Sequence, residues 1–302
     1  MTIATARLEL QRLHPHFGAE VRGVDLARPL DDAVFGRILD AFNEHAVLVF
    51  PGQDLDEERQ IAFSLRFGPL ERSIRSHLKR SVSRPEISDI SNLDEDGRML
   101  DPADERARYN AGNQLWHSDS SFKRVPAMAS LLHAREVPPE GGETEYADLR
   151  AAWDALPEAR RRGLEGLVAE HSIVYSRGLI GYAYPPDDAV TVPPVRQALV
   201  RTHPATGRRS LYLGSHASHI VGRPVAEGRA LLRELLEFAT RPALVYRHRW
   251  RAGDLVMWDN RCVLHRGRPW DETKHRRVMR RTTVAGDGPT VPEPQEPEEE
   301  RR

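Results

Sequence analysis

The first quarter of the chain alternates between two hydrophobic patterns. Within residues 31–44, and again within 56–66, apolar positions recur every three or four residues, which predicts two amphipathic helices. Between them, residues 46–50 form an uninterrupted apolar run that ends at a Pro-Gly pair, as expected for a buried strand. Two short strands are predicted ahead of the first helix, at Leu8–Leu10 and Glu20–Val24.

Short apolar runs separated by turn residues dominate the chain after residue 115. They predict strands at Ser130–His133, Thr144–Tyr146, Leu199–Thr202, Ser210–Leu213, Leu244–His248, Leu255–Trp258, Cys262–His265 and Arg280–Val284. Helical spacing predicts helices at Leu149–Ala155, Glu158–Ala169 and Val225–Thr240. Many short strands with few helices indicate a mainly β fold with helices: a double-stranded β-helix (jelly roll) core with surrounding α-helices.

The chain is expected to form a single domain over residues 1–286. Residues 287–302 are rich in proline and glutamate and cannot bury a core, so we predict a disordered acidic tail. Residues 73–111 are polar and show little periodicity. A stretch of that length is expected to be either a functional lid or disordered.

The composition is that of a globular protein with ample material for a core. The chain has 302 residues, 39% hydrophobic and 29% charged, with a formal net charge of −1. This balance gives no basic excess for nucleic acid or an anionic membrane. The lone cysteine, Cys262, excludes an internal disulfide, no apolar run approaches the ~18 residues of a membrane span, and the first residues lack a signal peptide's apolar core. We therefore expect a cytoplasmic protein, and we expect it to be a homo-oligomer.

Two histidines and an aspartate give the chain its most informative candidate chemistry. His117 and Asp119 are separated by one residue, so in a strand their side chains would project to the same side. His265 is the third candidate and arrives from another part of the fold. Two imidazoles and one carboxylate form the facial triad that holds a non-haem Fe(II) and leaves the opposite face of the ion open. A His-x-Asp tripeptide alone is common by chance, so the surrounding segments carry the argument.

Four segments, in the right order, carry a family resemblance. Asn113–Phe122 resembles the first metal segment of the Fe(II)/2-oxoglutarate dioxygenases of the taurine/2,4-dichlorophenoxyacetate (2,4-D) dioxygenase family, and Gly141–Thr144 resembles their co-substrate turn. Asp254–Pro269 looks like the second metal segment of that family, and His275–Arg281 looks like its closing basic strand. The likeness extends from about Ala19 to about Asp287.

Within this family, two further segments favour one branch. His216–His219 and Val225–Arg229 are closer to the members that act on 2,4-D than to those that act on taurine. The resemblance implies Fe(II), 2-oxoglutarate as co-substrate, O₂, and a small anionic aromatic substrate.

The resemblance also implies roles for individual residues. The iron ligands are matched by His117, Asp119 and His265, and the residues that bind 2-oxoglutarate are matched by Thr144, Arg277 and Asn113. Arg281 matches a basic residue at the anionic end of the primary substrate. The stretch between His265 and Arg277 is one residue longer than in the family pattern, which leaves Arg276 as an alternative to Arg277.

Physical chemistry supports the arginines independently. The second carboxylate of 2-oxoglutarate must meet a positive charge in a partly dry site, and the planar fork of arginine pairs bidentately with carboxylates. Arg277 and Arg281 lie four apart in a predicted strand, so both project to one face while Arg276 and Arg280 point away. The alternative is a solvated basic strand that is paired with Asp or Glu.

Phe122 and His216 are the remaining candidates for substrate contacts. Phe122 lies five residues after His117 and is suited to wall a substrate pocket, with core packing as the alternative. His216 is a candidate polar group facing the substrate, with a hydrogen-bonded structural role as the alternative. Trp116 and Trp258 are expected to pack behind the metal.

The reaction that the resemblance implies is hydroxylation of the carbon next to the ether oxygen of an aryloxyacetate such as 2,4-D. The product would fall apart to a phenol and glyoxylate, while 2-oxoglutarate becomes succinate and CO₂. The same chemistry on an alkyl sulfonate such as taurine, an alkyl sulfate or another aryl carboxylate stays open at this point. So do a non-catalytic jelly-roll metal-binding protein and a zinc hydrolase, since two histidines and a carboxylate also hold Zn²⁺.

Overall fold

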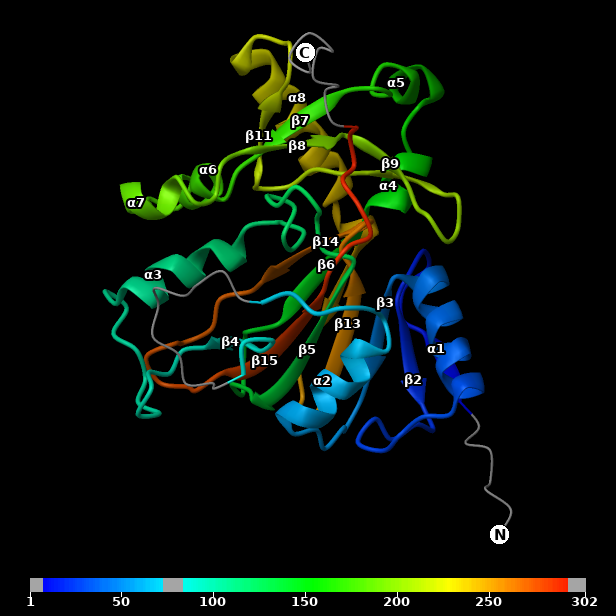
Figure 1. Cartoon of the computed structure of the whole chain (residues 1–302), viewed down its shortest axis with the longest axis vertical. Helices are drawn as coiled ribbons and strands as arrows, with labels where there is room; N and C mark the ends of the chain where they lie inside the picture. Colours follow the sequence, from blue (N-terminus) through cyan, green and yellow to red (C-terminus); the bar gives the residue numbers. More distant parts are fainter. Residues whose placement is uncertain (1–7, 73–83, 293–302) are drawn as a thin grey trace, which may run out of the picture.

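A seven-stranded sheet runs through the centre of the molecule (Figure 1). The computed structural model describes residues 8–72 and 84–292. The strand order across this sheet is β1 (Glu9–Arg12), β2 (Ala19–Arg22), β3 (Val47–Phe50), β13 (Leu255–Asp259), β5 (Ala129–Glu136), β15 (Val278–Val284) and β4 (Ser88–Ser91). Neighbouring strands are antiparallel, except for the parallel pair β2 and β3.

The central strands send alternate side chains into two different cores. In β3, Leu48 and Phe50 pack into the core on one face of the sheet, whereas Val47 and Val49 pack into the core on the other. Strand β13 alternates in the same way and places Trp258 in the second core. Because successive side chains of a strand point to opposite faces, burial of both faces explains why the predicted strand at 46–50 is apolar throughout.

Helices α1 (Asp32–His45) and α2 (Glu57–Leu65) cover the first of these faces, which confirms both helices predicted in this part of the chain (Figure 1). At the start of α1 the Asp31 side chain accepts a hydrogen bond from the Val34 N–H at 2.7 Å, as an N-cap does. The helix ends where Ala46 takes a left-handed φ of 58°, immediately before β3 begins.

A three-stranded sheet packs against the second face of the large sheet. Its strands are β12 (Val245–His248), β6 (Thr144–Asp148) and β14 (Val263–Gly267). Tyr146 and Val263 from this small sheet share one core with Trp258 and Met279 from the large one. Two sheets closed over a common core, with helices outside, form the jelly roll that the sequence predicts.

A further layer of short elements lies above both sheets in Figure 1. It contains β7 (Val168–His171), β8 (Val195–Ala198), β9 (Val200–Thr202), β10 (Arg209–Leu211), β11 (Ala217–Ile220), α4 (Leu149–Asp154), α5 (Glu158–Arg162), α6 (Ile173–Gly178), α7 (Pro186–Ala189), α8 (Val225–Ala239) and the 3-10 turn η2 (Pro242–Leu244). Trp116 and Leu264 belong to the hydrophobic core of this layer. The core therefore anchors the residues that directly precede His117 and His265. None of the helices described is long and apolar enough to cross a membrane.

The helix predicted over Glu158–Ala169 is wrong in its second half. Helix α5 ends at Arg162, and after Gly166, whose φ is 75°, the chain enters strand β7. This strand is the central one of a three-stranded sheet and pairs with both β8 and β11. Pairing with strands that lie far along the chain outweighs the helical spacing, and no local pattern signals it.

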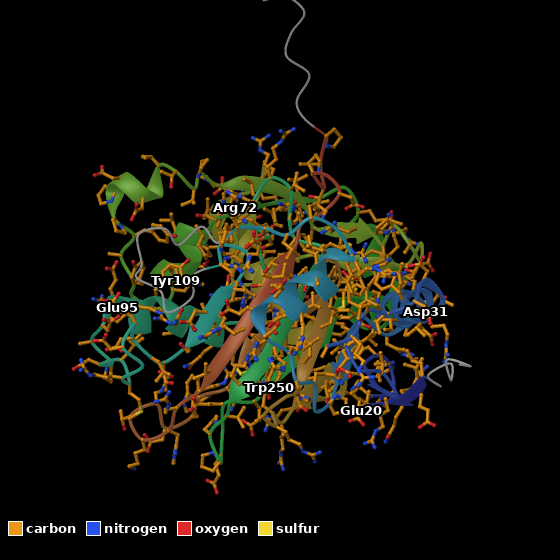
Figure 2. All side chains as sticks on the ribbon, turned by 60° about the horizontal axis from the view of Figure 1, so that its bottom comes forward. Glu20, Asp31, Arg72, Glu95, Tyr109 and Trp250 are labelled. Carbon is orange, nitrogen blue, oxygen red and sulfur yellow. The ribbon has the colours of Figure 1, made fainter. Side chains whose placement is uncertain are left out.

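The polar stretch 73–111 contains a strand and a helix within its described part. Strand β4 forms the edge of the large sheet, and α3 (Glu105–Asn110) leads into the 3-10 turn η1 (Ala111–Gln114) just before the candidate metal segment. Figure 2 shows Tyr109, in α3, on the opposite side of the molecule from Asp31. Residues 73–83 lie outside the described part of the chain.

The predicted acidic tail begins as chain that lies against β8. The Thr290 hydroxyl donates to the Gln197 side chain at 2.5 Å and accepts the Ala198 N–H at 2.9 Å. Residues 293–302 are not among those described, so disorder in that part stays a prediction.

Two helical glycines test how tightly the layers pack. A Cβ at Gly228, in α8, would lie 2.6 Å from the Ile220 nitrogen in β11, whereas a Cβ at Gly36, in α1, meets nothing within 4 Å. Gly228→Ala should lower the free energy of unfolding by about 1–2 kcal/mol, because overpacking outweighs the gain in helix propensity. Gly36→Ala should raise it by about 0.5–1 kcal/mol. Urea unfolding measures both, and a stabilising Gly228→Ala would contradict the close contact of α8 with β11.

Candidate functional site

Two reciprocal backbone hydrogen bonds join the His117 segment to strand β14. The His117 N–H donates to the His265 carbonyl at 3.0 Å, and the His265 N–H donates to the His117 carbonyl at 2.8 Å. This single bridge forms in place of the predicted strand through His117 and Asp119. Asp119 lies in a turn, and Ser120 has a φ of 56°, so the same-strand geometry predicted from the spacing is wrong.

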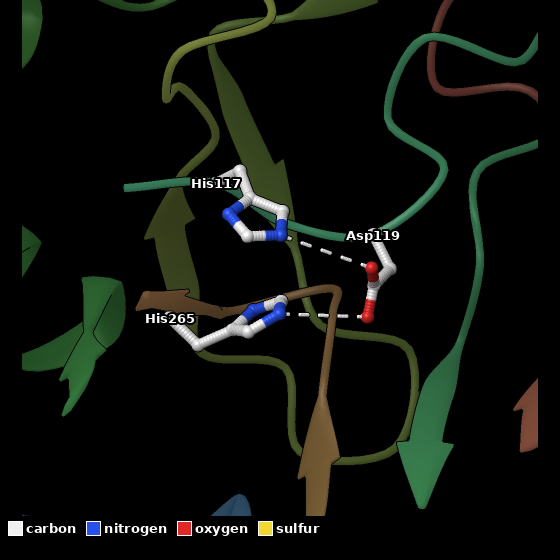
Figure 3. A group of neighbouring side chains, drawn as sticks. All are labelled: His117, Asp119 and His265. Carbon is white, nitrogen blue, oxygen red and sulfur yellow. Dashed lines mark ion pairs between the residues drawn. The ribbon is translucent and has the colours of Figure 1, made fainter. Parts of the chain in front are cut away.

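The turn still brings the Asp119 carboxylate to both imidazoles, as Figure 3 shows. Nε2 of His117 lies 3.9 Å from Oδ1 of Asp119, and Nε2 of His265 lies 3.6 Å from Oδ2. All three side chains are buried, and their potential ligand atoms lie within 4.8 Å of one another. The structure therefore brings together the three residues that the sequence selected.

Each imidazole keeps a nitrogen free to face the carboxylate. Nδ1 of His117 donates to the Leu115 carbonyl at 2.7 Å, which leaves a lone pair on Nε2. Burial lowers the pKa of His117 and of His265, and the neighbouring His117 lowers the pKa of His265 further. Both rings are therefore neutral near pH 7, which is the form that coordinates a metal.

Asp119 stays ionised although it is buried. Burial raises its pKa, but the charges of Arg281 and of the two histidines outweigh that effect and hold the pKa well below the usual range. Arg281 Nη1 donates to Oδ1 at 2.5 Å, and the Ser130 hydroxyl donates to Oδ2 at 2.7 Å. Asn260 accepts the Asp119 N–H at 3.0 Å and donates to Ser130 at 3.0 Å. Sequence reasoning missed Ser130 and Asn260, because neither interrupts a pattern.

This donor set fits a divalent transition metal with an open coordination face, because two neutral imidazoles and one carboxylate converge from one side. Trp258 packs behind it, with its ring centroid 4.5 Å from that of His265. Trp116 lies in the upper core, beside the same segment. Trp258 thus packs against a candidate ligand, as expected, whereas the position of Trp116 behind the metal stays a prediction.

A cavity of about 560 Å³ lies on the side of α3. Its walls come from β4, α3, η1 and the loop after β14, and they include Asn113, Trp270 and Arg277. Asn113 also lines the smaller cavity beside Asp119, so it lies between the two spaces.

Arg277 is a buried cation that has no carboxylate ion pair among the described residues. Its Nε donates to the Gly142 carbonyl at 3.2 Å, and its guanidinium lies 5.2 Å from the Trp270 ring centroid. Burial lowers the pKa of Arg277 to about 10, so the side chain remains charged at neutral pH. Gly142 has a φ of 69°, and a Cβ there would lie 3.2 Å from Arg277 Cδ, so the turn requires glycine.

The neighbouring Arg276 points away from this cavity. Its side chain is 47% exposed and pairs with Glu136 at 2.9 Å. Thr144, by contrast, is buried at the start of β6, two residues after Gly142. Its hydroxyl accepts the Trp250 indole N–H at 3.0 Å, which leaves the hydroxyl proton for another partner.

The three predicted substrate residues line the smaller cavity, of about 60 Å³, together with Asp119. The rings of Phe122 and His216 meet edge to face with centroids 5.0 Å apart. Nδ1 of His216 lies 2.8 Å from the Ser176 hydroxyl, which fixes the ring. Arg281 completes the set from strand β15.

A second group of potential metal ligands consists of His203, Asp259 and Cys262. Its carboxylate is already paired with an arginine side chain. Arg261 donates to Asp259 through Nε and Nη2 at 2.8 and 2.7 Å, and His203 Nε2 lies 2.9 Å from the same carboxylate. Burial raises the pKa of the Cys262 thiol, so it is uncharged at neutral pH. This group is a buried structural network, and His203 belongs to it.

Comparison with known proteins agrees with the geometry. A sequence model described as "Taurine catabolism dioxygenase TauD, TfdA family" matches residues 9–283. The chain belongs to this family. The TauD/TfdA assignment confirms the resemblance carried by the motifs and makes the chain an oxidoreductase, a 2-oxoglutarate-dependent dioxygenase that uses Fe(II) and O₂.

Relatives of the TauD/TfdA family cover nearly the whole chain. It is 50% identical over 275 residues to the alpha-ketoglutarate-dependent 2,4-dichlorophenoxyacetate dioxygenase of Cupriavidus pinatubonensis, covering 90% of this chain and 96% of that protein. It is 41% identical over 288 residues to the (S)-phenoxypropionate/alpha-ketoglutarate-dioxygenase of Sphingobium herbicidovorans, covering 92% and 95%. The solved structure of AAD-2 in complex with Mn(II) and N-oxalylglycine superposes with a TM-score of 0.91 at 46% identity, covering 94% of this chain and 99% of that one.

Removing the Asp119 carboxylate should weaken metal binding strongly. Asp119→Ala takes away the anionic donor and leaves Arg281 beside the ion, so the Kd for Mn(II) should rise at least about 100-fold. Isothermal titration calorimetry measures it. Ser118→Ala is the matched control, because that hydroxyl donates to the Val263 carbonyl at 2.9 Å, away from the triad. Wild-type Mn(II) affinity in Asp119→Ala would refute the site.

Proposed function

We propose that this dioxygenase hydroxylates the carbon next to the ether oxygen of aryloxyacetates such as 2,4-D. The observation that carries the proposal is a pair of neighbouring features. His117, Asp119 and His265 form a buried donor set for a metal. Arg277, which has no carboxylate ion pair among the described residues, places a buried positive charge in the cavity that shares Asn113 with the space beside Asp119. Such a charge calls for an anionic ligand beside the metal, and a dicarboxylate co-substrate meets that demand.

The candidate triad would hold the iron at which 2-oxoglutarate and O₂ react. When bound, iron, 2-oxoglutarate and O₂ supply the oxidation: 2-oxoglutarate becomes succinate and CO₂, and one oxygen atom enters a C–H bond of the substrate. His117, His265 and Asp119 hold the metal through two neutral rings and one carboxylate. Ser130 orients the carboxylate by its hydrogen bond at 2.7 Å.

Three residues bind 2-oxoglutarate in this proposal. Arg277 pairs with the distal carboxylate, held in place by the Gly142 carbonyl and the Trp270 ring. Thr144 donates its hydroxyl proton to the same ligand, since its oxygen already accepts from an indole. Asn113 lies between the two cavities and contacts the end of the co-substrate nearer the metal. N-oxalylglycine, which AAD-2 holds together with Mn(II), has the same two carboxylates as 2-oxoglutarate.

Three other residues bind the primary substrate. Arg281 Nε is buried without a hydrogen-bond partner among the described atoms, and it lies beside Asp119, so it can receive the carboxylate of an aryloxyacetate. Phe122 packs against the aryl ring, and His216 faces the substrate with its other nitrogen fixed by Ser176. Hydroxylation next to the ether oxygen gives a hemiacetal. Transfer of its hydroxyl proton to the ether oxygen then releases a phenol and glyoxylate.

The rival substrates share the anionic end, and only the aryl carboxylates among them also share the aromatic ring. An alkyl sulfonate, an alkyl sulfate or another aryl carboxylate would meet the same arginine, so a substrate panel must separate them. Hydrolysis at a zinc ion has less support, because it needs a general base. Glu71, the other carboxylate that lines the smaller cavity, is held by Lys123 at 2.6 Å and by Ser120 at 2.7 Å.

Alanine substitution of two neighbouring arginines should reveal which of them binds 2-oxoglutarate. Arg277→Ala should raise the KM for 2-oxoglutarate by a factor equivalent to about 2–5 kcal/mol, the range for removing one partner of a buried charge pair. The KM for 2,4-D should change far less. Arg276→Ala is the control and should leave both values unchanged, since it removes an exposed ion pair. The reverse outcome would move the role by one residue.

The substrate assignment is tested by changing the substrate. Replacing 2,4-D with 2,4-dichlorophenetole removes the carboxylate and should lower kcat/KM by about 2–5 kcal/mol. Removing one ring chlorine should lower it by only ~1–3 kcal/mol, because filling an apolar pocket discriminates weakly. Phenol release coupled to succinate formation is the measurement. Efficient succinate formation with taurine and none with aryloxyacetates would keep the reaction class and reject this substrate.

A further inference from the structure

Arg177 is a second cation in the wall of the smaller cavity. It lies near the end of helix α6, is 6% exposed, and lines the same space as Asp119 and Arg281. Its Nε is buried and has no hydrogen-bond partner among the described atoms. No sequence motif drew attention to it, because it lies in a short helix with no pattern of its own.

The charges lining this cavity do not balance. Lys123 pairs with Glu71 at 2.6 Å, and Arg281 pairs with Asp119 at 2.5 Å. Arg72 is exposed to solvent. Arg177 is therefore the buried cation of this lining that has no acidic partner in the described part of the chain. A buried charge without a counter-ion is costly, so its position favours an anionic ligand.

The surroundings hold the Arg177 guanidinium inside the molecule. Its Cζ lies 4.4 Å from the centroid of the Tyr109 ring, which attracts the cation but adds no negative charge. Gly112 lies against it, since a Cβ there would be only 2.2 Å from Nη1 and 2.6 Å from Cζ. Helix α6 is itself docked on the site, because the Ser172 N–H donates to the His216 carbonyl at 2.8 Å.

We propose that Arg177 is a substrate-binding residue that pairs with the carboxylate of the primary substrate, together with Arg281. This inference rests on the proposed function, because it assumes an anionic substrate in the smaller cavity. Arg281 already shares its charge with Asp119, whereas Arg177 has no such partner. The carboxylate therefore gains most from Arg177, and a neutral ether is rejected because it leaves this buried cation unpaired.

The test compares the binding of an acid and of its neutral counterpart. The enzyme is loaded with Fe(II) and 2-oxoglutarate without O₂, and 2,4-D or 2,4-dichlorophenetole is titrated in by calorimetry. Arg177→Gln should raise the Kd of 2,4-D by roughly 30-fold or more, while the Kd of the ether changes less than about 3-fold. Arg177→Lys keeps the charge but loses the planar fork, so its Kd for 2,4-D should fall between the two.

A matched control is available away from the site. Arg66 lies over the Phe35 ring with its Cζ 4.2 Å from the centroid, so Arg66→Gln removes a similar contact. It should leave both dissociation constants unchanged. Arg177 only shapes the cavity, and the inference is wrong, if Arg177→Gln raises the Kd of 2,4-D and of the ether by the same factor. The same holds if it leaves the Kd of 2,4-D unchanged.

Two further outcomes keep the inference separate from the proposed function. If the wild-type enzyme binds 2-oxoglutarate but not 2,4-D, the proposed substrate fails, and the inference falls with it. If Arg177→Gln does not fold, Arg177→Lys decides: it should bind 2,4-D more weakly than the wild type and the ether equally well. An Arg177→Lys enzyme with wild-type affinity for both ligands would overturn the role of the guanidinium.

Discussion

The site depends on keeping one carboxylate charged inside the protein. Asp119 is buried, and three neighbouring strands of the large sheet each supply a group that stabilises it. Strand β5 supplies Ser130, the residue after β13 is Asn260, and β15 supplies Arg281. Trp258 pairs with Ser130 across β13 and β5. The strand register that packs Trp258 into the core therefore also positions Ser130, which donates a hydrogen bond to Asp119. A slip of one residue would reverse the faces of a strand, so correct folding and an intact metal site require the same pairing.

The backbone bridge between His117 and His265 complements this arrangement from the small sheet. It fixes two imidazoles through main-chain hydrogen bonds, which tolerate changes in the surrounding side chains better than a side-chain contact would. Burial then keeps both rings neutral, while the arginine beside Asp119 keeps the carboxylate ionised. Two neutral imidazoles therefore lie within about 4 Å of an ionised carboxylate. These are the protonation states in which histidine and aspartate coordinate a metal.

The sequence predicts what repeats or what matches a motif, and it misses what depends on distant pairing. The apolar run at 46–50 and the helix at 31–44 were predictable, because burial on both faces or on one stripe leaves a direct mark. Strand β7 was not, since its two partners lie elsewhere in the chain and its own residues suit a helix. The grouping of His117, Asp119 and His265 was predictable from the motifs, although the expected strand geometry was wrong. The proposed role of Arg177 was not predictable, because it rests on the lack of an acidic partner among the described residues, which only the fold reveals.

Four arginines around the start of β15 illustrate how the fold distinguishes identical residues. Arg276 and Arg280 face away from the cavities, and protein carboxylates meet both, with distances of 2.9 Å to Glu136 and 2.6 Å to Asp89. On the other face, Arg277 has no carboxylate ion pair among the described residues, and Arg281 shares one with the metal site. Arg276 and Arg277 precede β15, whereas Arg280 and Arg281 lie in it. In each neighbouring pair, one arginine meets a protein carboxylate away from the cavities and the other lines a cavity. In the proposed function this buried positive charge favours anionic ligands in both cavities, because a neutral ligand would leave it buried and unpaired.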